Sequence, residues 1–362
     1  MNIVLNSLRK RIIQGYSPNA EESLDLYRSN FSELIELANL VKQRIHPESK
    51  VTYIIDRNVN LTNACFSQCS FCNFCVKVGS PDAYVLNLDD YKKKIEELFL
   101  IGGRQLLLQG GMNPELNIDF YEELFSSLKL IYPELKLHAL GPPEIVFLSK
   151  QSGLSYRDTL VRLRNAGLDS LPGAGAEILS DRVRKVISPA KCTVKQWLDV
   201  MREAHRLGFV TSATMMFGHI ETIEERIEHL LQIRQVQDEK PYNAQGFIAF
   251  IPWPFASKNT ILIKEHPNIQ KISASEYIRT IAISRIVLQN IPNIQASWLT
   301  VGKQIGAFCL HAGANDLGSI MIEENVVSAA GNRHTINQQE MIELIEDEGF
   351  EAQQRNQNYD FL

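Results

Sequence analysis

Alternating strand and helix patterns dominate the chain after residue 50. Short runs of apolar and β-branched residues, typical of strands, recur along it, and segments with a period near 3.6 residues lie between most of them. This alternation is typical of βαβ units, whose strands pair in parallel. The predicted strands are residues 52–60, 105–109, 135–140, 168–171, 209–216, 246–251, 294–298 and 314–317.

The predicted helices lie between these strands or flank them. They cover residues 88–101, 120–130, 156–165, 178–186, 194–206, 221–236 and 275–289. About eight repeats over residues 51–320 match the size of a (β/α)8 barrel, so we predict an α/β TIM-type barrel as the main domain. A doubly wound open sheet is the alternative.

The positions of the polar stretches favour the barrel. Stretches rich in glycine, proline and polar residues follow nearly all of the predicted strands, so they would meet at the carboxyl ends, where barrel active sites form. These stretches are residues 65–75, 109–111, 138–143, 172–177, 217–221 and 252–255. We expect residues 1–50 to be an N-terminal helical extension and residues 321–362 to be a helical tail, with residues 353–359 loosely held.

Four of the six cysteines fall within residues 65–75, directly after the first predicted strand. Cys65, Cys69 and Cys72 have the spacing C-x3-C-x2-C, so one loop can present three thiolates to three corners of a cubane [4Fe-4S] cluster. Clusters held by protein alone normally take four cysteines. The fourth iron would therefore be open to another ligand, as the open position of a catalytic zinc site is. We interpret Cys75 as a spectator thiol.

The cysteines allow two other interpretations. A structural zinc site could use all four, but such sites usually draw two ligand pairs from separated segments. A disulfide framework is less favoured, because a chain of 362 residues can bury a large core without covalent links. The isolated Cys192 and Cys309 are most simply buried small hydrophobic residues.

Composition and charge restrict the partners. The chain is 44% hydrophobic and 22% charged with a formal charge of −5, which argues against nucleic acid as the main partner and favours a small-molecule substrate. No apolar run approaches the roughly 20 residues of a membrane span. The first residues lead into basic ones without a signal-peptide core, so we expect a cytoplasmic protein.

Several polar residues at the predicted strand ends are candidates for chemistry. His138 and His219 have the pKa range for proton transfer. Glu177 and Glu221 could bind a ligand or simply favour the amino terminus of a helix. Arg57 could bind a substrate carboxylate, although a barrel ion pair is an equal alternative.

Three further positions complete this set. Gly110 and Gly111 allow close approach of backbone to a ligand or form a turn. Asn315, near the last predicted strand, is a candidate amide donor to substrate. Trp253 and Phe255 could stack on an aromatic ligand, but packing is the simpler interpretation.

The cysteine motif, with Phe71 before its third cysteine, resembles the signature of radical S-adenosylmethionine (SAM) enzymes. Within that superfamily the chain resembles the cyclic dehypoxanthine futalosine synthases of menaquinone biosynthesis over nearly its full length. The blocks that carry the resemblance are residues 63–72, 106–111, 137–140, 142–145, 173–179, 213–219, 250–255 and 313–316. The run Asn73-Phe74-Cys75-Val76 departs from the Ala-Phe-basic run of these relatives. Several blocks are also shared with the tyrosine-using subunit of deazaflavin (F420) synthase, and an aminofutalosine synthase is a further alternative.

The resemblance implies cofactors and site residues. A [4Fe-4S] cluster on Cys65, Cys69 and Cys72 would bind SAM, with Gly110 and Gly111 near its amine. Glu177 would contact the ribose or amine, and Glu221 belongs to the segment that contacts adenine.

The resemblance also implies a reaction. One electron from a donor such as flavodoxin or ferredoxin would cleave SAM, and the 5′-deoxyadenosyl radical would take hydrogen from the ribose C4′ of dehypoxanthine futalosine. The resulting radical would close onto the benzoate ring, with His138 or His219 as the proton acceptor.

Overall fold

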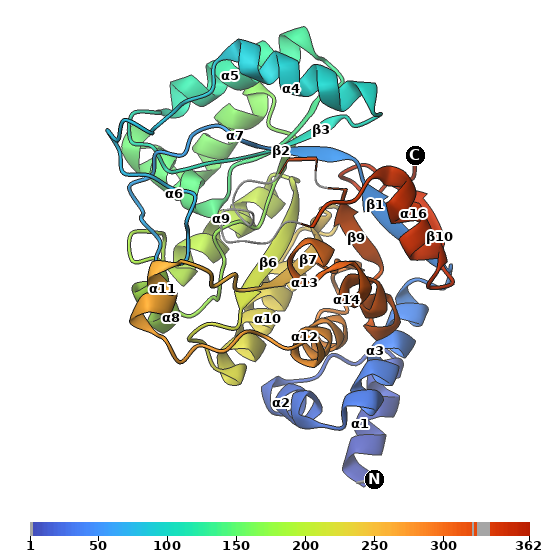
Figure 1. The fold of residues 1–362 in the computed structure, drawn as a ribbon. Coiled ribbons are helices and arrows are strands. Elements are labelled where there is room, and N and C mark those ends of the chain that lie inside the picture. Colours follow the sequence, from blue (N-terminus) through green and yellow to red (C-terminus); the bar gives the residue numbers. More distant parts are fainter. Residues whose placement is uncertain (1–2, 321, 324–333) are drawn as a thin grey trace.

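The computed structural model describes residues 3–320, 322–323 and 334–362. Before residue 50 the chain forms three helices, which lie beside α12 at the edge of the molecule (Figure 1). Their amphipathic patterns explain this: α3, for example, buries Leu34, Leu37, Ala38 and Val41 on one face. The bounds are α1 (Ile3–Ile13), α2 (Ala20–Arg28), α3 (Phe31–Ile45) and α12 (Ala274–Val287).

Parallel strands form the centre of the molecule. Seven of them make one sheet in chain order from β2 to β8, and β1 pairs in parallel with β9 in a second sheet. Their bounds are β1 (Lys50–Ile54), β2 (Asp56–Asn60), β3 (Gln105–Gln109), β4 (Lys136–Ala139), β5 (Ser170–Leu171), β6 (Val210–Phe217), β7 (Gly246–Pro254), β8 (Asn293–Ile294) and β9 (Asp316–Ser319).

Two connections close these strands into a ring. A parallel bridge between Gln295 and Asp316 links the end of β8 to β9, and β1 continues through Ile55 into β2. The predicted (β/α)8 barrel is therefore confirmed. Its first predicted strand, residues 52–60, is divided between β1, which pairs with β9, and β2, which pairs with β3.

Helices cover the outside of the barrel (Figure 1). Side-chain caps fix where many of them begin: Asn87, Asn117, Thr193 and Thr222 each accept a backbone N–H from the first turn of the helix that follows. The helices are α4 (Leu88–Leu100), α5 (Ile118–Ile131), α6 (Pro142–Ser152), α7 (Tyr156–Ala166), α8 (Asp181–Ile187), α9 (Val194–Arg206), α10 (Ile223–Asp238), α11 (Ile261–Glu265), α13 (Trp298–Val301), α14 (Lys303–Phe308) and the 3-10 helix η1 (Cys309–Ala312).

Three local predictions were wrong. Helix α6 was not predicted, although Pro142 and Pro143 occupy its first turn, where proline needs no hydrogen-bond partner for its nitrogen. Residues 252–255 were expected to form a loop, but β7 continues to Pro254 beside β6. A strand was predicted over residues 294–298, but β8 ends at Ile294 and Trp298 begins α13.

The C-terminal segment also differs from the expected helical tail. After α16 (Gln338–Glu346), residues Glu351–Gln354 form β10, which pairs in parallel with β1. Arg355 follows in a buried position and donates two hydrogen bonds to Asp316, at 2.6 and 3.0 Å. The polar sequence of residues 353–359 indicated a loosely held end. The contact that holds this segment could not be recognised locally, because Asp316, the partner of Arg355, lies on a strand that is distant in the chain.

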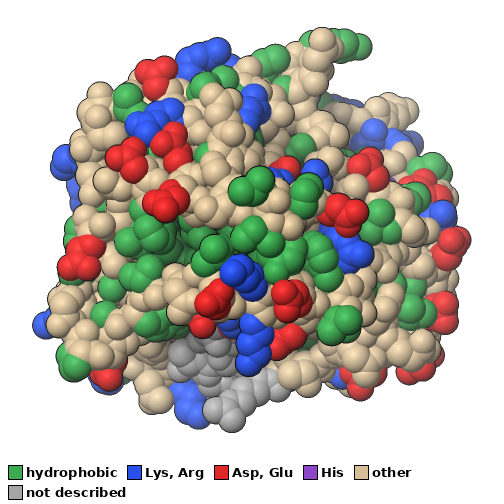
Figure 2. All heavy atoms as spheres, turned by 90° about the horizontal axis from the view of Figure 1, so that it is seen from above, with side chains coloured by type: hydrophobic (Ala, Val, Ile, Leu, Met, Phe, Trp, Pro, Cys, Tyr) green, Lys and Arg blue, Asp and Glu red, His purple; other side chains and the backbone are tan. Residues whose placement is uncertain are grey.

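The surface carries charges of both signs. On the face that Figure 2 shows, Lys and Arg side chains lie among Asp and Glu side chains, around a band of hydrophobic residues. Within the described part of the chain, no helix is both long and apolar enough to cross a membrane.

Candidate active site

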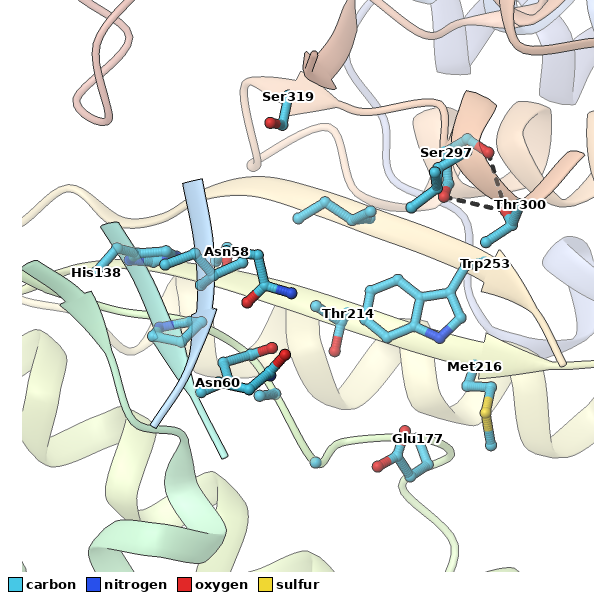
Figure 3. Close-up of a pocket in the computed structure, with 18 of the residues that line it drawn as sticks. Asn58, Asn60, His138, Glu177, Thr214, Met216, Trp253, Ser297, Thr300 and Ser319 are labelled. Carbon is cyan, nitrogen blue, oxygen red and sulfur yellow. Dashed lines mark hydrogen bonds between the residues drawn. The ribbon is translucent and has the colours of Figure 1, made fainter. Parts of the chain in front are cut away.

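A cavity of about 420 Å³ lies inside the barrel (Figure 3). It extends from the cysteine loop to the C-terminal segment, because its lining includes both Cys65 and Arg355. Side chains alternate along a strand, and on β2 the inward set is Asp56, Asn58 and Asn60. The barrel therefore surrounds one cavity, with polar side chains of β2 on its wall and the cysteines at its carboxyl end.

The three cysteines of the motif line this cavity together. Their loop is held by hydrogen bonds to the rest of the barrel: the backbone N–H of Met112 lies 3.3 Å from the sulfur of Cys65, and that of Phe66 donates to the carbonyl of Met112. The hydroxyl of Ser67 lies 3.2 Å from the sulfur of Cys69. Three thiols on one anchored loop facing one cavity are a donor set that fits an iron-sulfur cluster.

Cys75 lies among these thiols. Its sulfur is 3.5 Å from that of Cys72, and it also lines the cavity. Its hydrogen bonds lower the pKa of Cys65 and of Cys72 to about 6, while its own pKa is raised. Cys75 is therefore hydrogen-bonded to both Cys65 and Cys72.

The two glycines after β3 have different surroundings. Gly110 lines the cavity. Gly111 packs against the cysteine loop: a Cβ there would lie 2.1 Å from the carbonyl oxygen of Ala64 and 2.8 Å from the Cβ of Cys65. A side chain at position 111 would therefore displace the loop, which gives this glycine a packing role.

Glu177 points into the cavity with a cation beside it. The ammonium of Lys191 lies 3.0 Å from the Glu177 carboxylate and 5.3 Å from the centre of the Phe71 ring, and all three residues line the cavity. Burial would lower the pKa of Lys191, but Cys69 and Glu177 raise it well above its ordinary value. Glu177 also has a left-handed backbone (φ 46°), which is uncommon outside glycine and often found at functional sites.

Glu144 is a second buried carboxyl group in the lining. It accepts a hydrogen bond from the backbone N–H of Gly141 at 3.0 Å at the start of α6. Burial raises its pKa to about 7, against the opposing effect of Lys191. Neither Glu144 nor Lys191 was a predicted site residue. Glu144 could have been found in the block 142–145, whereas Lys191 lies in a loop without a motif.

The two candidate histidines are placed differently. His138 lines the cavity, and its Nδ1 lies 2.7 Å from the hydroxyl of Ser170. Burial lowers the pKa of His138 to about 3, so its imidazole is neutral and a weak base near neutral pH.

His219 is outside the cavity lining, with its Nε2 3.0 Å from the carbonyl of Met216 and its Nδ1 2.8 Å from the backbone N of Ile220. Both ring nitrogens are thus engaged locally. Glu221 is also away from the cavity: it accepts backbone N–H groups from Gly218 and His219 and pairs with Arg226 at 2.7 Å. Burial opposes its ionisation, but His219 and Arg226 hold the pKa of Glu221 below its ordinary value. These contacts order the loop after β6.

The structure does not bring Arg57 or Asn315 to the cavity. Arg57 points out of the barrel and pairs with Glu97 at 2.6 Å and Glu323 at 2.8 Å. The Asn315 amide accepts from Arg285 at 2.6 Å and donates to Asn293 at 2.8 Å. Of the two interpretations of Arg57, the ion pair is therefore the one that the geometry supports.

The remaining walls are of two kinds. Asn58, Asn60 and Gln105 make a polar wall on β2 and β3. Across the space lie Thr214 and Met216 on β6 and Trp253 on β7 (Figure 3). Phe255, just beyond β7, also lines the cavity. A ligand in this cavity would thus meet amides on one side and an aromatic, largely apolar surface on the other.

Comparisons with known proteins agree with this architecture. Residues 59–233 match the family described as "Radical SAM superfamily", and residues 244–362 match "CofH/MqnC C-terminal region". Among solved structures, the chain is similar to methylornithine synthase, with a TM-score of 0.72, 17% identity and coverage of 97% of this chain and 98% of the other. It is also similar to the [FeFe]-hydrogenase maturase HydG, with a TM-score of 0.74, 13% identity and coverage of 96% and 76%. At these identities the two structures support the fold.

Curated relatives are much closer in sequence. A cyclic dehypoxanthine futalosine synthase of Halalkalibacterium halodurans is 39% identical, covering 99% of this chain and 95% of the relative. One from Streptomyces coelicolor is 41% identical, covering 99% and 89%. A 5-amino-6-(D-ribitylamino)uracil--L-tyrosine 4-hydroxyphenyl transferase of Methanosarcina mazei is 40% identical, covering 87% and 80%. The chain therefore belongs to the radical SAM superfamily, in the family of enzymes that contains the cyclic dehypoxanthine futalosine synthases and their tyrosine-using relatives.

Proposed function

We propose that this enzyme converts dehypoxanthine futalosine into cyclic dehypoxanthine futalosine. The observation that carries the proposal is the cysteine loop, which opens directly into a cavity inside the barrel. The two synthases that match nearly the whole chain support the choice of substrate. A one-electron donor such as flavodoxin or ferredoxin would supply the reducing equivalent.

Cys65, Cys69 and Cys72 would hold the [4Fe-4S] cluster. SAM would lie beside them, where the Lys191 ammonium offers a partner for its methionyl carboxylate and the Glu177 carboxylate a partner for its amine. Gly110 leaves backbone open to the ligand, and Phe71 covers Lys191 from the loop. The chemistry that this group would supply when bound is reductive cleavage of SAM, and the 5′-deoxyadenosyl radical would take the C4′ hydrogen of the substrate ribose.

The protein has two further tasks, to orient the substrate and to accept a proton when the benzoate ring regains aromaticity. One electron must leave the ring radical with that proton, and the oxidised cluster would be its acceptor, so the donor's electron would be returned in each turnover. The barrel interior would limit the access of water to the reacting atoms and hold the donor carbon in place. Glu144 is the side chain whose pKa, about 7, best suits proton uptake near neutral pH. His138, with its low pKa, would contact the substrate as a neutral hydrogen-bonding group.

Anaerobic reconstitution tests the function. Protein loaded with iron and sulfide is reduced with dithionite in the presence of SAM and dehypoxanthine futalosine, and the products are separated by mass spectrometry. The proposal predicts 5′-deoxyadenosine and a product two mass units lighter than the substrate. SAM cleavage without any change in this substrate would contradict it.

The tyrosine-using reaction is the second candidate, because several relatives of similar identity carry that name. A parallel incubation with L-tyrosine and 5-amino-6-(D-ribitylamino)uracil decides between the two. Conversion of that pair, and not of dehypoxanthine futalosine, would replace the first assignment with the second.

A further inference from the structure

We propose that the wall formed by β2 and β3 is a subsite for the hydroxyl groups of the substrate's sugar. The inference rests on the proposed function for the identity of that sugar, a ribose. It depends on Asn58 and Gln105, which the sequence did not single out.

Both amide side chains carry an oxygen without a partner. Asn58 is 6% exposed and Gln105 is 4% exposed, and both line the cavity. Among the described residues, no donor reaches the Oδ1 of Asn58 or the Oε1 of Gln105. A buried acceptor left without a hydrogen bond is unfavourable, so such groups in a native protein usually await a ligand or water. These two oxygens therefore indicate a ligand with hydrogen-bond donors on this wall.

The rest of Gln105 is fixed in place. Its Nε2 donates to Asp56 at 3.1 Å and to Gln357 of the C-terminal segment at 2.9 Å. These two bonds orient the amide, so its oxygen cannot be exchanged for the nitrogen without losing both. The position of the free acceptor is thus set by β2 on one side and by the end of the chain on the other.

The charges around this wall exclude an anionic group as its ligand. The cations that line the cavity in the described part of the chain are Lys191 and Arg355, and each already pairs with a carboxylate, Glu177 or Asp316. His138 is neutral. An unpaired carboxylate placed on this wall would lie near the carboxyl group of Asp56 and the oriented oxygen of Gln105, without a compensating cation.

Hydroxyl groups suit the wall better than an aromatic ring does. Asn58 lies two residues along β2 from Asp56, the partner of Gln105 in the strand register, so the two free oxygens lie at successive levels of the same wall. Hydroxyls on neighbouring carbons can donate to both. An aromatic ring of the substrate would instead pack against Trp253 and Phe255, which line the other side of the cavity. The substrate would therefore lie with its sugar on β2 and β3 and its ring toward β7.

Substitution of Asn58 by leucine tests the subsite. The variant Asn58→Leu keeps the volume and removes the free acceptor. We expect it to bind dehypoxanthine futalosine about 10- to 100-fold more weakly than the wild type, the effect of one lost hydrogen bond to a buried partner. Binding is measured by calorimetry on the reconstituted enzyme with SAM and without reductant. The melting temperature without substrate should not fall, because the replaced oxygen makes no hydrogen bond with the described residues of the free protein.

Analogues lacking the 2′- or 3′-hydroxyl identify the contact. The wild type should bind at least one of them more weakly than the parent compound, whereas Asn58→Leu should not distinguish that analogue from the parent. The variant Asn290→Leu is the control, since it also removes a buried, unpartnered Oδ1, but on a half-buried residue outside the cavity whose amide nitrogen donates to Arg234 and Asp238. It should leave binding unchanged even if it lowers stability.

The outcomes separate this inference from the proposed function. If the wild type converts only the ribitylaminouracil and tyrosine, the proposed function fails, and the same measurements with the ribityl compound then test the subsite. If Asn58→Leu binds the converted substrate as tightly as the wild type does, the subsite is wrong whichever substrate that is.

Discussion

The two ends of the barrel interior are built in contrasting ways. At the carboxyl end, thiols, Lys191, Glu177 and Glu144 bring several ionisable groups into one place. At the amino end, Arg355 is neutralised by Asp316, the carboxyl group of Asp56 accepts hydrogen bonds from Gln105 and Ser319, and the other polar side chains are amides, hydroxyls and a neutral His138. The contrast shows how one cavity can offer charged groups where a charged cofactor is expected and neutral hydrogen bonds elsewhere.

The ends are also closed by different parts of the chain. The cysteine loop is local: it joins β2 to α4, and its backbone is fixed by Gly111 and Met112 after the neighbouring strand. The amino end is closed by residues about 300 positions away, because β10 pairs with β1 and places Arg355 inside. Changes at the first end should affect cofactor chemistry, and changes at the second should affect folding.

The largest expected effect is at the cysteine loop. Replacing Cys65, Cys69 or Cys72 with alanine removes one of the three proposed cluster ligands, so cluster content and SAM cleavage should fall to background. Iron and sulfide analysis, the visible absorption of the cluster and 5′-deoxyadenosine formation measure this. Cys75→Ala is the matched control and should retain both, and loss of the cluster in that variant would make Cys75 a ligand.

At the amino end, the expected effect is on stability. Asp316→Ala leaves the buried Arg355 guanidinium without its partner, and such a change costs about 3–5 kcal/mol of unfolding free energy. Urea unfolding measures it. Glu351→Gln on β10 is the comparison variant: its pair with Lys50 spans 3.5 Å and its side chain is 64% exposed, so the change should be below about 1 kcal/mol. Equal effects of the two would mean that β10 does not close the barrel as a unit.

The neutral state of His138 predicts a pH dependence. Burial lowers its pKa in the folded protein to about 3, whereas the unfolded chain takes up the proton near the ordinary value of 6.5. Between these values the unfolded state binds more protons, so stability falls as the pH is lowered from 6.5 toward 3, by at most about 1.4 kcal/mol per pH unit from this group. His138→Gln should flatten the urea-unfolding profile over this range.

Other groups contribute to the same range. His205 and His229 are also buried with lowered pKa values, and they remain in both proteins. The difference between the wild-type and His138→Gln profiles therefore isolates His138. A constant difference from pH 7 to pH 4 would show that the imidazole titrates normally in the folded state.

The sequence predicted local features well. Periodicity placed α9 at its observed bounds, and β3 likewise, because each buries its own regular set of apolar side chains. The cysteine spacing gave the loop that faces the cavity. What it missed depends on contacts between distant segments: β10 pairs with β1, Lys191 reaches Glu177 from a loop without regular structure, and Gln105 is fixed by Gln357.

Arg57 shows why such contacts decide a role. Its sequence position, three residues before the end of β2, suggested a substrate anchor, but strand alternation turns its side chain away from Asp56 and Asn58, which face the cavity.

The smallest predicted effect follows from this orientation. Arg57→Met should leave substrate affinity unchanged and lower stability by about 1 kcal/mol, because the pairs with Glu97 and Glu323 are partly solvated. Calorimetry with dehypoxanthine futalosine and urea unfolding measure the two quantities. A loss of affinity of tenfold or more, with stability unchanged, would place a charged substrate group at the outer face of β2 and would contradict the neutral wall proposed inside it.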